Sequence, residues 1–454
     1  MLGAIDHRDG ELVSLAVNYC KNSTMNSITY LQHARRTKAI AGMVLILFSP
    51  SCLAAGAWLT ETGGADMGMA GAGRGAMSQD GAALAANPAA IGGLPESTVT
   101  VALLLPALDL EFQGTGDTPG SAENESGVVP AGSLFGVYRA DRLSLGLGVY
   151  SYLGLGLDLG NDWVGSRVIE EAGLRSINIA PTAAYRLTDR LGVGASIAAQ
   201  YADVKAALGV SNDAAFYGPP VGLPDGRLEL EGSSWAPGGS LGVLYRASSS
   251  TRLGLSWTSS VQHSVDMDLH GRNLHPVLAG MLPGPGQVEL DVTLPQQLTL
   301  STTTQLSPAT LLGISTGWQD WSVLGGSKLS AAGQAASVFP DGLRDTWNLS
   351  VGIRHEVSAE WAVTAGVAYD SDPSVNGDMP VYFPVAEQLR IATGVERMLS
   401  EDCTLRMALS VVNQGAVRVE QDTNPLPLPG AGPLSGSFQS SRVYMLSMAA
   451  DVHL

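Results

Sequence analysis

The sequence predicts an all-β protein: a 14-stranded antiparallel transmembrane β-barrel with an N-terminal hatch, or plug, inside the lumen. Segments in which apolar residues alternate with polar or small ones recur along most of the 454-residue chain, and this two-residue period is typical of β-strands. Short polar turns alternate with long loops. Only 15% of residues are charged while glycine reaches 55, which is unusual for a soluble enzyme and typical of a membrane barrel.

The alternation is clearest in three stretches. Between Leu143 and Leu157, large apolar residues hold nearly all odd positions, and glycine, serine or tyrosine holds the even ones. Trp347–Ile353 repeats the pattern, and Tyr444–Leu454 carries an apolar residue at every second position up to the end. Each stretch is therefore predicted to be a strand with one apolar face.

The connections between these segments fall into two kinds. Six are short and polar, with the composition of tight hairpins: they lie at residues 139–142, 188–190, 248–251, 307–309, 358–360 and 400–402. Seven are longer and rich in Gly, Pro, Asp and Asn: they lie around 114–130, 158–172, 207–227, 268–286, 323–343, 371–386 and 414–440. Together they predict 14 strands, with long loops at one end of the barrel and short turns and both chain ends at the other.

Residues 1–54 are predicted to be a cleaved signal peptide. A basic run at His33–Lys38, an apolar run at Ala39–Phe48 and small residues at Cys52–Ala54 form its three parts. The sequence leaves open whether translation starts at Met1 or at Met25. No other apolar run approaches the roughly 20 residues that a membrane helix needs.

The remaining chain divides into a hatch, residues 55–95, and a barrel, residues 96–454. The stretch Ala55–Pro95 is too rich in Gly and Ala to build a core of its own. A 14-stranded barrel is too wide for its own side chains to fill, since about eight strands leave an interior just wide enough for them. Because the stretch precedes the first strand on the short-turn side, it is predicted to plug the lumen.

Charge and cysteine content exclude several partners. The formal net charge of −17 grows more negative without residues 1–54, which carry five basic and three acidic residues. This acidity disfavours nucleic acid, whose phosphates would be repelled, and a polyanion-selective pore. Cys20 and Cys52 leave with the signal peptide, so Cys403 alone remains. We therefore expect no intramolecular disulfide and no thiolate metal site.

No catalytic set is evident. The seven histidines are scattered, and neither a Gly-x-Ser-x-Gly elbow nor a His-Glu-x-x-His motif occurs. The glycines of Gly71–Gly75 lack the strand and helix that a phosphate loop requires. We expect no enzyme, no cofactor, and no catalytic or metal-binding residue.

Several blocks resemble a known family. The Gly/Ala-rich run from Ala55, followed by Asp80 and by Asn87, Pro88 and Ala89, is similar to the N-terminal hatch and the Asn-Pro-Ala signature of outer-membrane long-chain fatty acid transporters of the FadL/TodX type, which include transporters of aromatic hydrocarbons. Further blocks follow in the order of that family: Ile179–Gly194, Gly242–Ser256, Trp318–Ser322 and Asp345–Pro373.

The resemblance implies uptake of hydrophobic small molecules across the bacterial outer membrane, with long-chain fatty acids or related lipids and hydrocarbons as ligands. Extracellular loops would capture the ligand, a pocket above the hatch would receive it, and a hatch rearrangement or a lateral opening would release it passively. Outer-membrane lipids and the barrel assembly machinery are the other expected partners of a monomer. The alternatives are a general diffusion porin, with an open charged constriction, and a structural or adhesive barrel without a pocket.

Candidate ligand contacts lie in the long loops. The loop at 268–286 carries apolar residues where a solvated loop is expected to be polar: Leu274, Val277, Leu278, Met281 and Leu282. They form either a capture surface or a packed closure of the barrel mouth. Arg167, Lys328 and Arg344 either meet a carboxylate head group or are solvated charges.

Four hatch residues are assigned to the gate: Asp80, Asn87, Pro88 and Ala89. Proline sets its own backbone angle and restricts the preceding residue, so Asn87 and Pro88 are predicted to fix a turn against the wall without touching the ligand. Asp80 is expected to pair with a base or cap backbone groups. Trp318 and Trp321 are expected on opposite faces of one strand.

Overall fold

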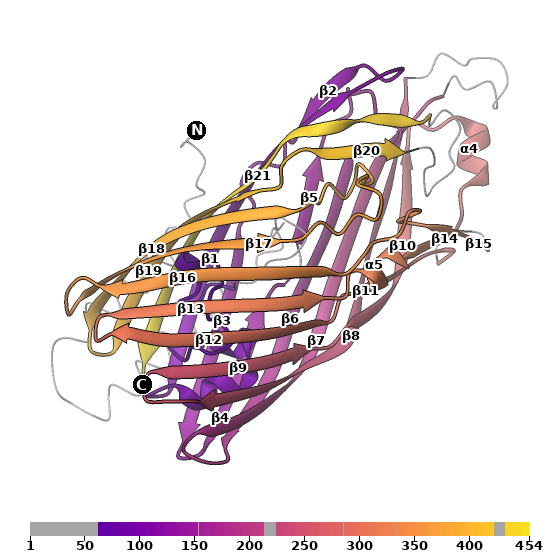
Figure 1. Ribbon diagram of the computed structural model, residues 1–454. Helices are drawn as coiled ribbons and strands as arrows, with labels where there is room; N and C mark the ends of the chain where they lie inside the picture. Colours follow the sequence, from indigo (N-terminus) through magenta and orange to yellow (C-terminus); the bar gives the residue numbers. More distant parts are fainter. Residues whose placement is uncertain (1–61, 153, 213–223, 285, 332, 422–431) are drawn as a thin grey trace.

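The computed structural model describes residues 62–454 except 153, 213–223, 285, 332 and 422–431. The described chain forms a closed antiparallel barrel with residues 62–95 buried within it (Figure 1). The predicted signal peptide, residues 1–54, and Met25 lie outside the described residues and stay predictions. No helix in the described part of the chain is long and apolar enough to cross a membrane.

Fourteen antiparallel strands build the wall, as the sequence predicts. Some are interrupted and carry two labels: β1 (Thr98–Gly114), β3 (Ala131–Ala140), β4 (Leu143–Tyr150) with β5 (Gly154–Asp158), β6 (Glu171–Arg186), β7 (Leu191–Val210), β8 (Gly226–Arg246), β9 (Thr251–Thr258) with β10 (Val261–Arg272), β11 (Val288–Leu294) with β12 (Gln297–Ser307), β13 (Thr310–Gln319), β16 (Thr346–Glu356), β17 (Trp361–Asp370), β18 (Gln388–Ser400), β19 (Cys403–Asn413) with β20 (Val417–Gln421), and β21 (Leu434–His453). The barrel closes where β1 pairs with β21, Thr98 lying opposite His453.

The short turns gather at one end and the long loops at the other (Figure 1). The loops hold the short strands β2 (Gly120–Glu123), β14 (Lys328–Ala331) and β15 (Gln334–Ser337) and the helices α4 (Pro276–Met281) and α5 (Ser322–Gly325). The predicted loop at 414–440 is wrong at residues 417–421 and 434–440, and residues 422–431 lie outside the described residues. Val417–Gln421 and the first residues of β21 pair with each other and extend the wall, because their alternating apolar residues continue the strand pattern.

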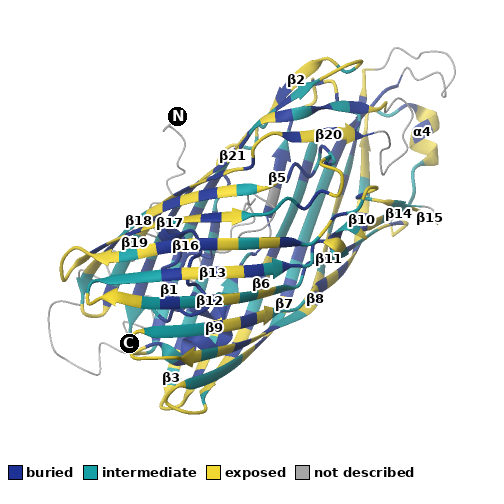
Figure 2. Ribbon diagram, viewed as in Figure 1, coloured by how far each residue is buried: buried dark blue, intermediate teal, exposed yellow. Residues whose placement is uncertain are grey.

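The outer face of the wall is apolar. Exposed and buried positions alternate along β12, β13 and β16 (Figure 2), and the exposed set includes Leu349, Val351 and Ile353. Two aromatic belts border this face. Strand register puts Trp257, Trp318 and Trp347 at one level, through Leu298, towards the long loops. Tyr138, Tyr185, Tyr245 and Trp361 are exposed near the short turns. Such girdles border the lipid-facing band of a membrane barrel.

The position expected for Trp321 is wrong. Strand β13 ends at Gln319, and Trp321 is the residue before helix α5, buried with 4% of its surface exposed. Its indole nitrogen donates to the Gln319 side-chain oxygen at 2.8 Å. The chain has already left the wall at this point, so strand alternation no longer applies.

Residues 62–95 cross the lumen from one wall to the other. The 3₁₀ helix η1 (Met67–Met69) packs against β16, β17, β18 and β19, whereas η2 (Pro88–Gly93) packs against β4, β6, β7 and β8. The short helix α3 (Ala83–Ala86) adjoins β4 and η2. Nearly all of these residues are buried, so this small-residue segment obtains its core from the wall around it.

Glycines of the wall admit the hatch backbone. A Cβ atom at Gly254 would lie 1.9 Å from the Gly75 carbonyl oxygen, and one at Gly366 would lie 2.2 Å from that of Met69. We call the wall glycines that contact the hatch the glycine ring: Gly146, Gly148, Gly194, Gly242, Gly254, Gly313, Gly352, Gly366 and Gly394. The high glycine content thus serves close packing between two backbones.

Cys403, the first residue of β19, is disulfide-bonded, contrary to the expectation of no intramolecular disulfide. That expectation assumed the loss of residues 1–54, whereas the full 454-residue chain still contains them. The other two cysteines, Cys20 and Cys52, lie outside the described residues.

The glycine ring generates a prediction. Gly254→Ala is expected to lower the free energy of unfolding by about 1–3 kcal/mol, because the added methyl group overpacks the hatch contact. Gly136→Ala, on β3, is the matched control, since nothing lies within 4 Å of its Cβ position; its unfolding free energy is expected to change by less than about 0.5 kcal/mol. Denaturant titration measures both, and coincident unfolding curves of the two variants would contradict the proposed packing.

Candidate functional site

Asn87 anchors one side of the hatch. Its side-chain nitrogen donates to the Gly75 carbonyl at 2.7 Å and to the Val243 carbonyl of β8 at 3.1 Å. Its side-chain oxygen accepts from the Ala89 backbone nitrogen at 3.0 Å, which caps η2 at Pro88. The Asn87 side chain is fully buried. The turn is therefore tied to the hatch and to the wall together.

Asp80 lies at the centre of a second attachment. Its carboxylate accepts from the backbone nitrogens of Ala65 at 2.6 Å and Ala82 at 2.9 Å, and pairs with Arg406 of β19 at 3.6 Å. With only 3% of its surface exposed, Asp80 joins two hatch segments to the far wall. A buried charge of this kind is costly unless it is paired and hydrogen-bonded.

The attachment extends through a buried polar network. Arg406 also pairs with Asp451 of β21 and, at 3.6 Å, with Glu396 of β18. Asp451 accepts a hydrogen bond of 2.7 Å from the Thr100 hydroxyl, and the Thr100 oxygen accepts one of 2.9 Å from the Gly81 backbone nitrogen. The hatch is thus hydrogen-bonded to β1 and ion-paired to β19, on the side where the barrel closes.

Between the hatch and the long loops, the lumen is filled by apolar side chains. We call this set the upper cluster; among its members are Phe112, Trp163, Trp321, Phe339, Phe383 and Phe438. Phe112 contacts Trp163 and Phe438 edge-to-face at 5.4 Å between ring centroids. Many of the cluster residues come from the long loops. These loops therefore fold inward and make this part of the lumen apolar.

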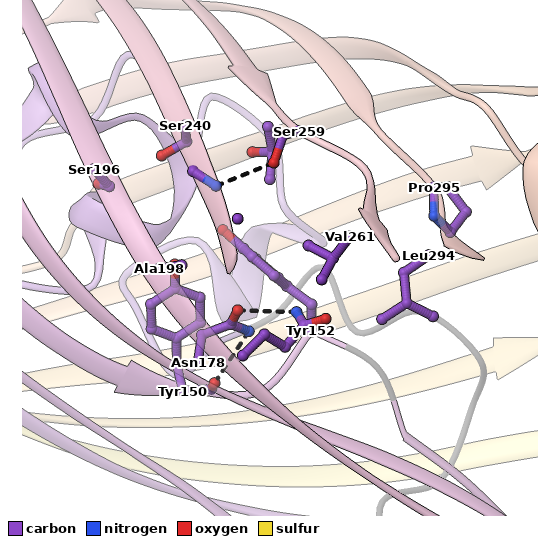
Figure 3. A pocket seen from close by; sticks show the side chains of 14 residues that line it. Tyr150, Tyr152, Asn178, Ser196, Ala198, Ser240, Ser259, Val261, Leu294 and Pro295 are labelled. Carbon is purple, nitrogen blue, oxygen red and sulfur yellow. Dashed lines mark hydrogen bonds between the residues drawn. The ribbon is translucent and has the colours of Figure 1, made fainter. Parts of the chain in front are cut away.

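A small cavity lies between the hatch and the upper cluster. Figure 3 shows Tyr150, Asn178 and Ala198 on one side of it and Val261, Leu294 and Pro295 on the other. The Tyr152 hydroxyl, which also lines it, donates to the hatch carbonyl of Ala85. The cavity measures about 20 Å³, room for little more than one water molecule. A hydrophobic ligand therefore enters only if neighbouring groups move.

Hydrogen-bonded polar side chains form the base of this cavity. Gln200 donates to Asn178 at 2.9 Å and its oxygen lies 3.0 Å from a ring nitrogen of His263, whose other nitrogen lies 2.8 Å from the Ser234 hydroxyl. These buried groups satisfy one another, so the cavity offers a ligand mainly its apolar side.

The wall is irregular at its third strand, where β4 and β5 are separated by residues 151–153. Between β5 and the outer half of β1 the wall is completed by residues 124–130. Backbone nitrogens of Asn124 and Val129 donate to carbonyls of β1 at 2.9 Å, and that of Glu125 donates to Asp158 at 2.7 Å. A loop segment, rather than a regular strand, closes the barrel here.

The candidate capture residues divide between two environments. Leu278 is buried, and Leu274 and Leu282 pack against the same cluster, formed with residues of β7, β8, β10 and β11. Val277 and Met281, on α4, are 44% and 61% exposed. The loop therefore packs on the sheet extension through three side chains and presents two apolar ones to solvent.

The three candidate head-group cations differ in their surroundings. Arg167 pairs with Asp225 at 3.1 Å, and Arg344 lies 3.8 Å from the Asp372 carboxylate and donates to its carbonyl. Lys328 begins β14 and is exposed. Their surroundings are those of surface charges.

Sequence reasoning missed the buried network and the upper cluster. Arg406 and Glu396 sit in apolar strands at lumen-facing positions, and a charge inside a transmembrane segment is itself a signal of function or attachment. The upper cluster left no comparable signal, because its aromatic residues are scattered through loops whose inward packing has no sequence period.

The described residues include no group of His, Cys, Asp or Glu that could hold a metal ion.

Comparisons with known proteins agree with this architecture. A family model described as outer membrane protein transport protein (OMPP1/FadL/TodX) matches residues 45–452. A long-chain fatty acid transport protein of Escherichia coli O6:H1 is 24% identical over 432 residues, covering 89% of this chain and 95% of the relative. Outer membrane protein P1 of Haemophilus influenzae is 23% identical over 387 residues, covering 74% and 81%.

Solved structures share the fold. A Pseudomonas aeruginosa FadL homologue superposes with a TM-score of 0.76 at 19% identity, covering 88% of this chain and all of that one. The toluene transporter TodX of P. putida superposes with a TM-score of 0.64 at 16% identity, covering 87% and 99%.

The Asn87 anchor generates a prediction. Asn87→Ala removes three hydrogen bonds and leaves buried carbonyls unpaired, at about 1–3 kcal/mol for each unpaired group. We expect faster amide exchange in residues 72–90, measured by hydrogen–deuterium exchange. Asn413→Ala, at an exposed position of β19, is the control and is expected to leave hatch exchange unchanged. Equal protection of the hatch in wild type and Asn87→Ala would show that the anchor contributes little.

Proposed function

Because the chain belongs to the outer membrane protein transport protein family (OMPP1/FadL/TodX) and lies in the outer membrane, we propose that it is a passive transporter that takes up hydrophobic small molecules. The observation that carries the proposal is a lumen sealed by a hatch beneath an apolar upper cluster. A general diffusion porin needs an open, polar constriction, and a structural barrel needs neither element.

Long-chain fatty acids or related lipids and hydrocarbons are the ligand class that we propose. One relative is named for long-chain fatty acid transport and one solved neighbour for toluene transport. The upper cluster supports an apolar ligand on physical grounds, because each Å² of apolar ligand surface removed from water contributes about 25 cal/mol. Transport, not catalysis, is accordingly the proposed activity.

Capture begins at the exposed face of α4. Val277 and Met281 offer apolar surface at the long-loop end, which faces outward in outer-membrane barrels, while Leu274, Leu278 and Leu282 hold the loop in place. Arg167, Lys328 and Arg344 lie in or beside the same set of loops, where a carboxylate head group would meet them. From here the ligand enters the upper cluster and then reaches the small cavity by displacing the side chains around it.

Release takes place past the hatch. In this proposal residues 55–95 form the gate. Asn87, Pro88 and Ala89 are its fixed point, because the Asn87 side chain is hydrogen-bonded to β8. The ion pair between Asp80 and Arg406 is the attachment that yields, since Arg406 retains Asp451 and Glu396 as partners when this pair opens. Residues before Asp80 then move, and the ligand continues towards the short-turn end.

The proposal is tested by uptake of a fluorescent long-chain fatty acid into cells that depend on this protein. Val277→Asp/Met281→Asp is expected to reduce uptake about tenfold, because charges replace the apolar capture surface. The control is Val357→Asp, an exposed valine in a turn at the opposite end of the barrel, which is expected to leave uptake unchanged. Equal uptake by both variants would contradict the proposed capture step. Large steady ion currents through the wild-type protein in planar bilayers would contradict the transporter proposal and favour a porin.

A further inference from the structure

A second cavity lies at the short-turn end, under the last residues of the hatch. It measures about 160 Å³ and is therefore much larger than the cavity above the hatch. Its walls are hatch residues 89–95 and the turn ends of β3, β6, β7, β8 and β9. In an outer-membrane barrel the short turns face the periplasm, so this cavity lies on the exit side.

Arginine dominates the lining of this cavity, which we call the arginine cavity. Five arginines line it with a single acid, Asp189: they are Arg139, Arg186, Arg190, Arg246 and Arg252. The chain as a whole has a formal net charge of −17 and only 25 lysines and arginines. A fifth of its basic residues thus surrounds one cavity, although the acidity of the whole chain would predict a negatively charged lining.

Two of the five arginines are occupied by the protein itself. Arg139 donates to the carbonyls of Leu94 and Pro95, the latter at 2.7 Å, and so joins β3 to the end of the hatch. Arg186 donates to the Asp141 carbonyl, and its guanidinium lies 4.0 Å from the Asp141 carboxylate. These two fix the rim of the cavity.

The other three have no such partner. Within the described residues, the side chains of Arg190, Arg246 and Arg252 form neither an ion pair nor a hydrogen bond. Arg246 and Arg252 are directly opposite each other on β8 and β9, an arrangement in which like charges repel and destabilise a sheet. An oxyanion between them would convert this repulsion into two charge-assisted contacts, which guanidinium groups form with particular geometric fit.

Apolar side chains also line the cavity. They belong to Leu94 and Pro95 of the hatch and to Leu191 and Leu244 of the wall. A small inorganic anion would use the arginines and leave these apolar side chains without a partner. A molecule with an anionic head and an apolar chain would contact both kinds of side chain.

We propose that the arginine cavity is an exit site that binds the oxyanion head group of an amphiphile, with Arg246 and Arg252 as its principal contacts. The inference rests on the proposed function, which supplies such an amphiphile in the form of a long-chain fatty acid carboxylate. Head-group binding below the hatch gives an acid a favourable step after the apolar lumen and orients it with the carboxylate towards the periplasm.

Photolabelling of the purified full-length protein in neutral detergent tests this site. The probes are dodecanoic acid carrying a diazirine beside the carboxylate and the corresponding alcohol, and adducts are located by peptide mass spectrometry. The acid is expected to label residues 89–95 and the turn ends of β7 and β8, and the alcohol to label them about tenfold less. Arg246→Gln/Arg252→Gln is expected to reduce labelling by the acid about tenfold, whereas Arg246→Lys/Arg252→Lys retains most of it.

The control is Arg142→Gln/Arg397→Gln, which removes two arginines from the same end that do not line the cavity. It is expected to label as wild type does. Adducts of the acid confined to the upper cluster would overturn the exit site and leave the uptake proposal standing, whereas no adduct in either region would count against both. Displacement of the acid from residues 89–95 by millimolar inorganic phosphate alone would show a general anion site and overturn the head-group assignment.

Discussion

The fold depends on one constraint, the close approach of the hatch backbone to the barrel wall. Side chains alone do not fill the interior of a barrel with fourteen strands, and the hatch has too few large side chains to do so. Both the hatch and the wall carry small residues where they meet. The glycine ring lets the wall backbone meet the hatch backbone directly, and Asn87, Asp80 and Arg406 satisfy the polar groups that this contact buries.

The same constraint divides the lumen into two chemically different spaces. Above the hatch, aromatic and aliphatic side chains from inward-folded loops create an apolar interior. Below it, arginines meet the last hatch residues in the arginine cavity. An apolar chain with an anionic head would therefore find a favourable environment on each side, with the hatch as the barrier between them. The proposed passive uptake of such molecules therefore needs no source of energy in the barrel.

Much of the wall could be predicted because its signals are local. Strand alternation identifies lipid-facing residues such as Leu349 and Val351, and turn composition locates the hairpins. The hatch could be predicted from the mismatch between its small residues and the width of the barrel. Contacts between distant segments could not be predicted: Asn87 bonds to Val243, 156 residues later, and residues of five strands line the arginine cavity. Such contacts depend on barrel closure. The position of Trp321 could not be predicted either, because the packing of a loop into the lumen has no sequence period.

The central claim is that the hatch moves during transport while its Asn87 turn stays fixed. Ala70 of the hatch packs against Ala368 of β17, so Ala70→Cys/Ala368→Cys would tether the moving part to the wall on oxidation. Ile353→Cys/Ala365→Cys, at paired positions of β16 and β17, controls for oxidation within the wall. We predict that uptake of the fluorescent fatty acid is lost on oxidation of the hatch pair, restored by reduction, and unaffected in the wall pair. Undiminished uptake with the hatch fully crosslinked would contradict the account and favour lateral release through the wall past a static hatch.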